Sequence, residues 1–152
     1  DSTILLTKEL DETIFRSIFY SIKLPSDSFF VSRGRWSNFF LDCQSGNPIM
    51  GYTLELFYNW LLIKDYFIDY FMMDYFMDMV LRDNAALKFQ IESIPYNNEN
   101  IHKLKFHLEE EFSTDRLNEI CGDTYIHKLS WKNCTGTPTP NTIYFYFYNM
   151  YR

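Results

Sequence analysis

The sequence predicts an all-β fold, a β-sandwich of mainly antiparallel strands with one or two short helices. Three observations favour it. Apolar and polar residues alternate along several short segments, turn residues separate these segments, and one segment has helix-capping residues at both ends. The chain has 152 residues, of which 47% are hydrophobic and 20% aromatic. This is enough apolar material for a single domain over 1–152 with its own core.

The first third of the chain predicts strands joined by turns. Apolar residues at alternate positions predict a strand over 13–24, which the sequence Pro25-Ser26-Asp27-Ser28 ends. The short apolar runs 29–31 and 39–41 flank Arg33-Gly34-Arg35 and predict a hairpin. A further turn is expected over 44–48, before the most aromatic part of the sequence.

That aromatic part, residues 54–81, has an ambiguous period. Asp65 and Asp69 would share one face of a strand, whereas Asp74 and Asp78 have even numbers and would lie on the opposite face. A bulge near Met73 would be needed to bring all four acids to the same face. On a helix, at about 100° per residue, the four acids would spread over more than half of the circumference. Because no clean polar stripe results, strands are favoured.

The second half predicts further strands and one helix. Residues 87–92 and 103–108 alternate as half-buried antiparallel strands, with a loop over 95–100 between them. Thr114 is the expected N-cap of a helix over 115–121, and Gly122 follows where a helix commonly ends. Residues 125–131 predict a strand leading to Cys134, and 143–148 predict a last strand with Phe and Tyr on opposite faces.

Membrane insertion and redox state can also be addressed from the sequence. Residues 54–81 are long enough to span a bilayer but contain several charged side chains, which are costly there, so no membrane insertion is expected. Cys43, Cys121 and Cys134 form an odd set, from which at most one internal disulfide can form. Asn133 begins an Asn-Cys-Thr glycosylation site, which matters only in a secreted chain.

The sequence offers no residue set for catalysis or for a cofactor. His102 and His107 are five apart, so in one strand they would point to opposite faces and could not share a metal. There is no phosphate-binding glycine motif and no recognisable nucleophile context around any Ser or Cys. The net charge of −6 argues against nucleic acid as a partner. We therefore expect no catalytic residue, metal or cofactor, and a chain that is not an enzyme.

Acidic residues are grouped in two regions. Six acids accompany two bases over 55–83, and six accompany one base over 109–123. Such groups commonly form a solvated face that aids solubility, or they can steer a small basic protein toward the surface. On the second hypothesis the binding residues are Asp65, Asp69, Asp74 and Asp78, the contact aromatics Tyr66 and Tyr70, and a secondary patch of Glu109, Glu110 and Glu111.

The run over 21–30 (Ser-Ile-Lys-Leu-Pro-Ser-Asp-Ser-Phe-Phe), the closing residues 144–152 and a residue usage typical of AT-rich genomes give the chain a family likeness. It resembles the poxviral SECRET domain, which forms the carboxyl end of secreted viral tumour necrosis factor receptors. The helix at 114–121 followed by a strand ending at Cys134 is also similar in layout to stand-alone poxviral chemokine inhibitors.

The resemblance implies a secreted β-sandwich that binds host chemokines, without catalysis, and serves viral immune evasion. It further implies that 1–152 is excised from a larger receptor, whose other domains bind tumour necrosis factor. Two alternatives stay open. The first is a non-catalytic intracellular viral β-sandwich with reduced cysteines and no sugar on Asn133. The second is a hydrolase with an unrecognised carboxylate site.

Overall fold

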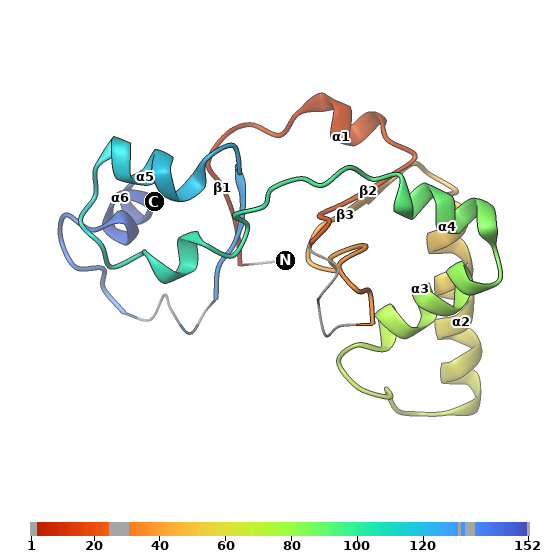
Figure 1. The fold of residues 1–152 in the computed structure, drawn as a ribbon. Coiled ribbons are helices and arrows are strands. Elements are labelled where there is room, and N and C mark those ends of the chain that lie inside the picture. The colour runs from red at the N-terminus through yellow and green to blue at the C-terminus, as the bar shows by residue number, and fades with distance from the viewer. Residues whose placement is uncertain (1–2, 25–30, 131, 133–135, 152) are drawn as a thin grey trace. The chain divides into compact units, whose positions relative to one another are not determined.

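The computed structural model describes residues 3–24, 31–130, 132 and 136–151 (Figure 1). The chain divides into two compact units. We call residues 11–97 the central unit, and residues 1–10 together with 98–152 the terminal unit. The expectation of a single domain over 1–152 stays a prediction.

The predicted all-β sandwich is wrong. The described residues form six α-helices, one short 3-10 helix and only four strands of three residues each. In chain order the elements are β1 (Ile4–Leu6), α1 (Glu12–Arg16), β2 (Phe19–Ser21), β3 (Leu41–Cys43), α2 (Pro48–Ile63), α3 (Met72–Arg82), α4 (Ala85–Glu92), η1 (Leu104–Phe106), α5 (Thr114–Cys121), β4 (Ile126–Lys128) and α6 (Ile143–Met150).

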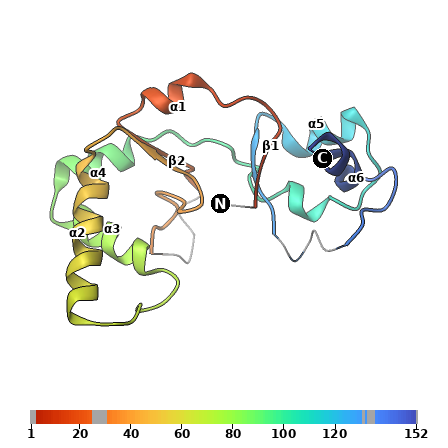
Figure 2. The same cartoon turned by 180° about the vertical axis from the view of Figure 1, so that it is seen from behind.

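The central unit is built around three consecutive helices and one small sheet. Helices α2 and α3 lie side by side, as seen from the front and from behind (Figures 1 and 2), and the Phe57 and Phe76 rings meet edge to face between them. Strands β2 and β3 pair antiparallel, with Phe19 opposite Cys43. The buried core contains Phe19, Trp36, Ile49, Met77, Leu81, Leu87, Ile91 and Ile94.

Two helices, α2 and α3, occupy the segment for which strands were favoured. Asn47 caps α2 by accepting a hydrogen bond from the Ile49 amide, and Pro48 occupies the first turn, where its missing N–H costs nothing. The bulge expected at Met73 is instead the first turn of α3. The period was ambiguous because α3 buries Asp74 and Asp78 on the face that also buries Leu81, so acids do not mark its solvent side.

Other strand predictions fail for related reasons. Residues 87–92 lie in α4, 103–108 contain η1, and 143–148 lie in α6, where Thr142 caps the helix by accepting a hydrogen bond from the Phe145 amide. The strand expected over 13–24 is divided between α1 and the short β2. Alternation over six residues does not distinguish a strand from a helix, because six residues make fewer than two helical turns. The turn expected at Pro25-Ser26-Asp27-Ser28 lies outside the described residues.

The terminal unit confirms two predictions. The helix expected over 115–121 is α5, capped by Ser113 rather than Thr114 and followed by Gly122 at a φ of +54°. Strand β4 lies inside the predicted strand 125–131 and pairs antiparallel with β1, so that Leu5 faces His127. The core of this unit consists of Leu104, Leu108, Ile120, Cys121, Ile143 and Phe147.

Cys43 is half-buried and Cys121 is buried, and both are free thiols. Burial raises the pKa of each thiol. Asn133 and Cys134 lie outside the described residues, so glycosylation and secretion stay predictions. Within the described part of the chain, every helix is too short or too polar to cross a bilayer.

Candidate functional site

A groove of about 420 Å³ lies in the central unit between α2 and the junction of α3 with α4. Tyr52, Glu55 and Asn59 line it from α2, where their spacing places them on one face of the helix. Asp83 and Asn84 line it from the α3–α4 junction. Leu56, Met79 and Val80 complete the lining.

The groove offers hydrogen-bonding groups of both kinds. The carboxylates of Glu55 and Asp83 are acceptors, and the amides of Asn59 and Asn84 supply donors as well. Asn84 Oδ1 caps α4 by accepting a hydrogen bond from the Leu87 amide over 3.1 Å, which leaves the side-chain NH₂ group for a ligand. The Tyr52 side chain is half exposed. The arrangement suits a ligand rich in hydroxyl groups, and two carboxylates disfavour a phosphate.

A buried carboxylate, Asp74, holds α3 against the segment before β3. Trp36 Nε1 donates to Asp74 Oδ1 over 2.7 Å, and Asn38 Nδ2 donates to Asp74 Oδ2 over 2.6 Å. Burial raises the pKa of Asp74, and these two hydrogen bonds oppose that rise. Because both oxygens already have partners, Asp74 positions α3 and is not an open ligand site.

One turn further along α3, Asp78 lies between two arginines. Arg35 Nη2 is 2.5 Å from Asp78 Oδ1, and Arg82 Nε is 2.8 Å from Asp78 Oδ2. Burial alone would raise the pKa of Asp78, but the hydrogen bonds from both guanidinium groups lower it below its usual range. The Arg35 guanidinium also lies over the Trp36 ring, 4.7 Å from its centroid. Asp74 and Asp78 therefore fix α3, whose last turn leads to Asp83 in the groove.

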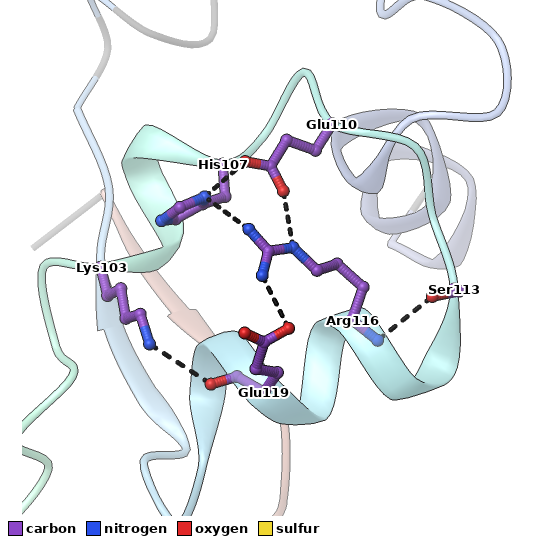
Figure 3. A network of polar contacts seen from close by, with 6 residues as sticks. All are labelled: Lys103, His107, Glu110, Ser113, Arg116 and Glu119. Carbon is purple, nitrogen blue, oxygen red and sulfur yellow. Dashed lines mark hydrogen bonds and ion pairs between the residues drawn. The ribbon is translucent and has the colours of Figure 1, made fainter.

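The terminal unit carries a second polar network (Figure 3). His107 Nδ1 is 2.6 Å from Glu110 Oε1, and Arg116 bonds Glu110 Oε2 through Nε and Glu119 Oε2 through Nη1, each over 2.7 Å. Lys103 Nζ donates to the Glu119 carbonyl oxygen over 3.3 Å. Hydrogen bonds from Arg116 and His107 lower the pKa of Glu110 to about 2. The network ties the η1 region to α5.

The structure separates the acids that the sequence grouped together. Asp65 and Asp69 are exposed between α2 and α3, whereas Asp74 and Asp78 are buried. Asp69 accepts hydrogen bonds from the Phe71 amide, over 2.6 Å, and from the Tyr75 hydroxyl, over 2.8 Å. The four acids therefore do not form one exposed surface.

The other predicted binding residues also lie in different surroundings. Tyr66 and Tyr70 are exposed in the α2–α3 loop, with 53% and 89% of their surface accessible. Glu109 is exposed, Glu110 belongs to the network with Arg116, and Glu111 forms a backbone bridge with Thr142. The three glutamates thus have three different roles.

Sequence reasoning missed the groove residues. It counted Glu55 and Asp83 among the grouped acids but did not propose either as a ligand, and it did not consider Tyr52, Asn59 or Asn84. The spacing of Tyr52, Glu55 and Asn59 would have placed them on one face, had 48–63 been recognised as a helix. Among the residues described, no group of three or more His, Cys, Asp or Glu side chains is arranged to hold a metal ion.

Comparison with known families assigns the chain. The model of the capsular polysaccharide synthesis protein family matches residues 1–147, so the chain belongs to that family. Comparisons with curated proteins and with solved structures gave no significant match.

The family match overturns the poxviral resemblance and what it implied. The chain is not a SECRET domain, and host chemokines, viral immune evasion and an accompanying tumour necrosis factor-binding region are not supported. The intracellular viral β-sandwich fails as well, because the fold is mixed and mainly helical. The resemblance rested on residue usage and on runs without a mechanistic motif, and the closing run forms most of α6 rather than a strand.

Proposed function

We propose that the chain takes part in building a capsular polysaccharide by binding a glycan in the groove between α2 and the α3–α4 junction. The observation that carries the proposal is the match to the capsular polysaccharide synthesis family over 1–147. Such a polymer grows by transfer of sugar residues onto hydroxyl groups, so a protein that builds it has to hold a glycan.

The lining of the groove supports this ligand class. A carboxylate can accept hydrogen bonds from two neighbouring hydroxyls, and an amide can both donate and accept, which matches the mixed donors and acceptors of a sugar ring. Glu55, Asp83, Asn59 and Asn84 supply these groups, and the Tyr52 ring supplies an apolar face. The two carboxylates would repel the diphosphate of a nucleotide sugar. The groove therefore suits the glycan that receives the sugar.

Glycosyl transfer is the reaction class in which we place the chain, and binding the acceptor glycan is the step assigned to this groove. Asp74 and Asp78 act at a distance from the ligand, because they hold α3 and thereby the position of Asp83. The expectation that the chain itself does not catalyse stays a prediction. A transfer assay with and without a nucleotide sugar tests it.

Binding is tested by applying the whole chain to an array of bacterial capsular polysaccharides and measuring affinities for the captured glycans by calorimetry. The variant Glu55→Gln/Asp83→Asn keeps the size of both side chains, and we expect it to weaken binding about tenfold or more. Glu99→Gln, an exposed change in the terminal unit, is the matched control and should bind normally. Equal affinity of the groove variant and the control, or no capture by the folded chain, would refute the proposal.

A further inference from the structure

The terminal unit contains a second groove, of about 460 Å³, which the proposed function does not use. It lies along α6 and the residues just before it, and Phe112, which directly precedes the N-cap of α5, also contributes. Its lining consists of Phe112, Asn141, Thr142, Phe145, Tyr146, Asn149 and Met150.

Aromatic rings form one wall of this groove. Phe112 and Tyr146 stack face to face, with ring centroids 4.0 Å apart and an interplanar angle of 11°. Backbone hydrogen bonds fix both residues: the Phe112 amide donates to the Asn141 carbonyl over 2.8 Å, and the Tyr146 amide donates to the Thr142 carbonyl over 3.0 Å. Each ring therefore covers one face of the other, and the two-ring stack is held in place before any ligand arrives.

Two amide side chains at the groove have hydrogen-bonding capacity to spare. The exposed Asn141 side chain has no hydrogen-bond partner among the described residues. Asn149 Nδ2 donates to the Phe145 carbonyl over 2.9 Å, which leaves its Oδ1 as an acceptor. The Thr142 hydroxyl is already used, because it donates to the Thr139 carbonyl and accepts from the Phe145 amide. The two amides, together with the Tyr146 hydroxyl, are thus the side-chain polar groups that a ligand would meet.

The lining contains no charged side chain. A phosphate or a carboxylate would find no cation there, and a basic ligand would find no carboxylate, so the groove suits a neutral molecule. A sugar ring has polarised C–H groups that pack on the negative face of an aromatic ring, and hydroxyls at its edge that bond to amides. The outward ring face of the stack, beside unused amides, matches both parts of that ligand.

We propose that this groove is a second glycan site, which binds an uncharged sugar residue against the outward face of the Phe112–Tyr146 stack with Asn141 and Asn149 on its hydroxyls. The inference rests on the proposed function for the choice of a glycan as ligand class. It goes beyond that function by assigning sugar binding to both units of the chain. It also separates the two sites by chemistry, since the central groove has two carboxylates and this one has none.

The test is a ¹H–¹⁵N NMR titration of the whole chain with three probes: maltotriose, triacetylchitotriose and trigalacturonate. We expect at least one neutral probe to shift the amide signals of Asn141, Tyr146 and Asn149, and trigalacturonate to leave them unchanged. In Asn141→Gly/Asn149→Ala the affinity measured at the Tyr146 signal should fall about fivefold or more. The Gly change is structurally mild, because Asn141 has a φ of +66°, which glycine adopts readily.

A second variant protects the test against loss of structure. Tyr148→Ala removes a neighbouring aromatic ring of α6 that does not line the groove, and it should leave the affinity unchanged. If no neutral probe shifts the three signals, or if the amide double variant binds as tightly as Tyr148→Ala, the inference is overturned.

The same spectra distinguish this inference from the proposed function. Signals of Glu55, Asn59 and Asp83 report on the central groove, and those of Asn141, Tyr146 and Asn149 report on the second one. Shifts confined to the central signals would refute the second site alone. Shifts confined to the terminal signals would support the second site and count against the assignment of the central groove.

Discussion

Trp36 and Asp74 are joined by a hydrogen bond in the interior of the central unit, where the indole N–H donates to the carboxylate over 2.7 Å. Only 1% of the Trp36 surface and 5% of the Asp74 surface is exposed. Water has no access to replace either partner there. The contact therefore fixes the segment before β3 to α3, and removing one partner leaves a buried polar group unsatisfied.

Asp74→Ala should lower the free energy of unfolding by about 1–3 kcal/mol, since Trp36 Nε1 and Asn38 Nδ2 both lose their acceptor. Urea unfolding followed by tryptophan fluorescence measures the change. Asp65→Ala, in the exposed α2–α3 loop, is the control and should stay within about 0.5 kcal/mol of the parent. Equal midpoints for the two variants would contradict the importance given to the contact.

Asp78→Ala should lower the free energy of unfolding by about 1–3 kcal/mol, because the Arg35 side chain is only 20% exposed and loses its carboxylate. Arg82 bonds the same carboxylate but is 73% exposed, so Arg82→Ala should change the stability by only about 0–1 kcal/mol. The two variants are compared by urea unfolding at one pH. A larger loss for Arg82→Ala would mean that Arg35 is not the partner that matters.

Glu110 should contribute to the acid sensitivity of the fold. Its pKa is lowered from 4.5 to about 2 in the folded chain by hydrogen bonds from Arg116 and His107. A carboxyl group whose pKa is lower in the folded chain stabilises the fold fully at a pH above its pKa in the unfolded chain. This stabilisation is lost as the pH falls through the pKa in the folded chain. As the pH is lowered from 4.5 to about 2, the urea midpoint of unfolding should therefore fall less steeply for Glu110→Gln than for the parent. Glu109→Gln, an exposed neighbour, should follow the parent curve.

Two glycine substitutions should have opposite effects on stability. Gly122 has a φ of +54°, and a Cβ there would lie 3.2 Å from Asn100 Nδ2, so Gly122→Ala should lower the thermal midpoint at a cost of about 1 kcal/mol or more. Gly51 lies inside α2 with open space around it, so Gly51→Ala should gain about 0.5–1 kcal/mol from helix propensity. Calorimetry of both variants checks the pair, and a midpoint raised by Gly122→Ala would contradict it.

Sequence patterns predicted those elements whose limits are encoded locally. The helix α5 has a capping hydroxyl at its start and a glycine after its end, and both act within a few residues. The α3 helix could not be found in this way, because Asp74 and Asp78 are on its buried face and are satisfied there by Trp36 and Arg35. Those partners lie 38 and 43 residues away in sequence, beyond the reach of any periodicity argument.

The groove between α2 and the α3–α4 junction was out of reach for the same reason. The sequence shows its carboxylates only as members of a group of acids. Which acids face a groove, which bind arginine and which face water depends on helix packing. The poxviral likeness shows the complementary difficulty, since a biased residue usage can make unrelated chains look alike in short runs. The family match extends over residues 1–147, whereas the poxviral likeness rested on short runs.

Because β1 pairs with β4, the two units can fold at different stages of translation. The central unit is continuous in sequence, so it can fold as soon as residue 97 has left the ribosome. The terminal unit cannot, because Leu5 emerges early and its partner His127 emerges more than a hundred residues later. Until then the backbone N–H and C=O groups of Ile4–Leu6 lack their partner strand on the nascent chain. Slower translation between residues 10 and 128 would lengthen that period.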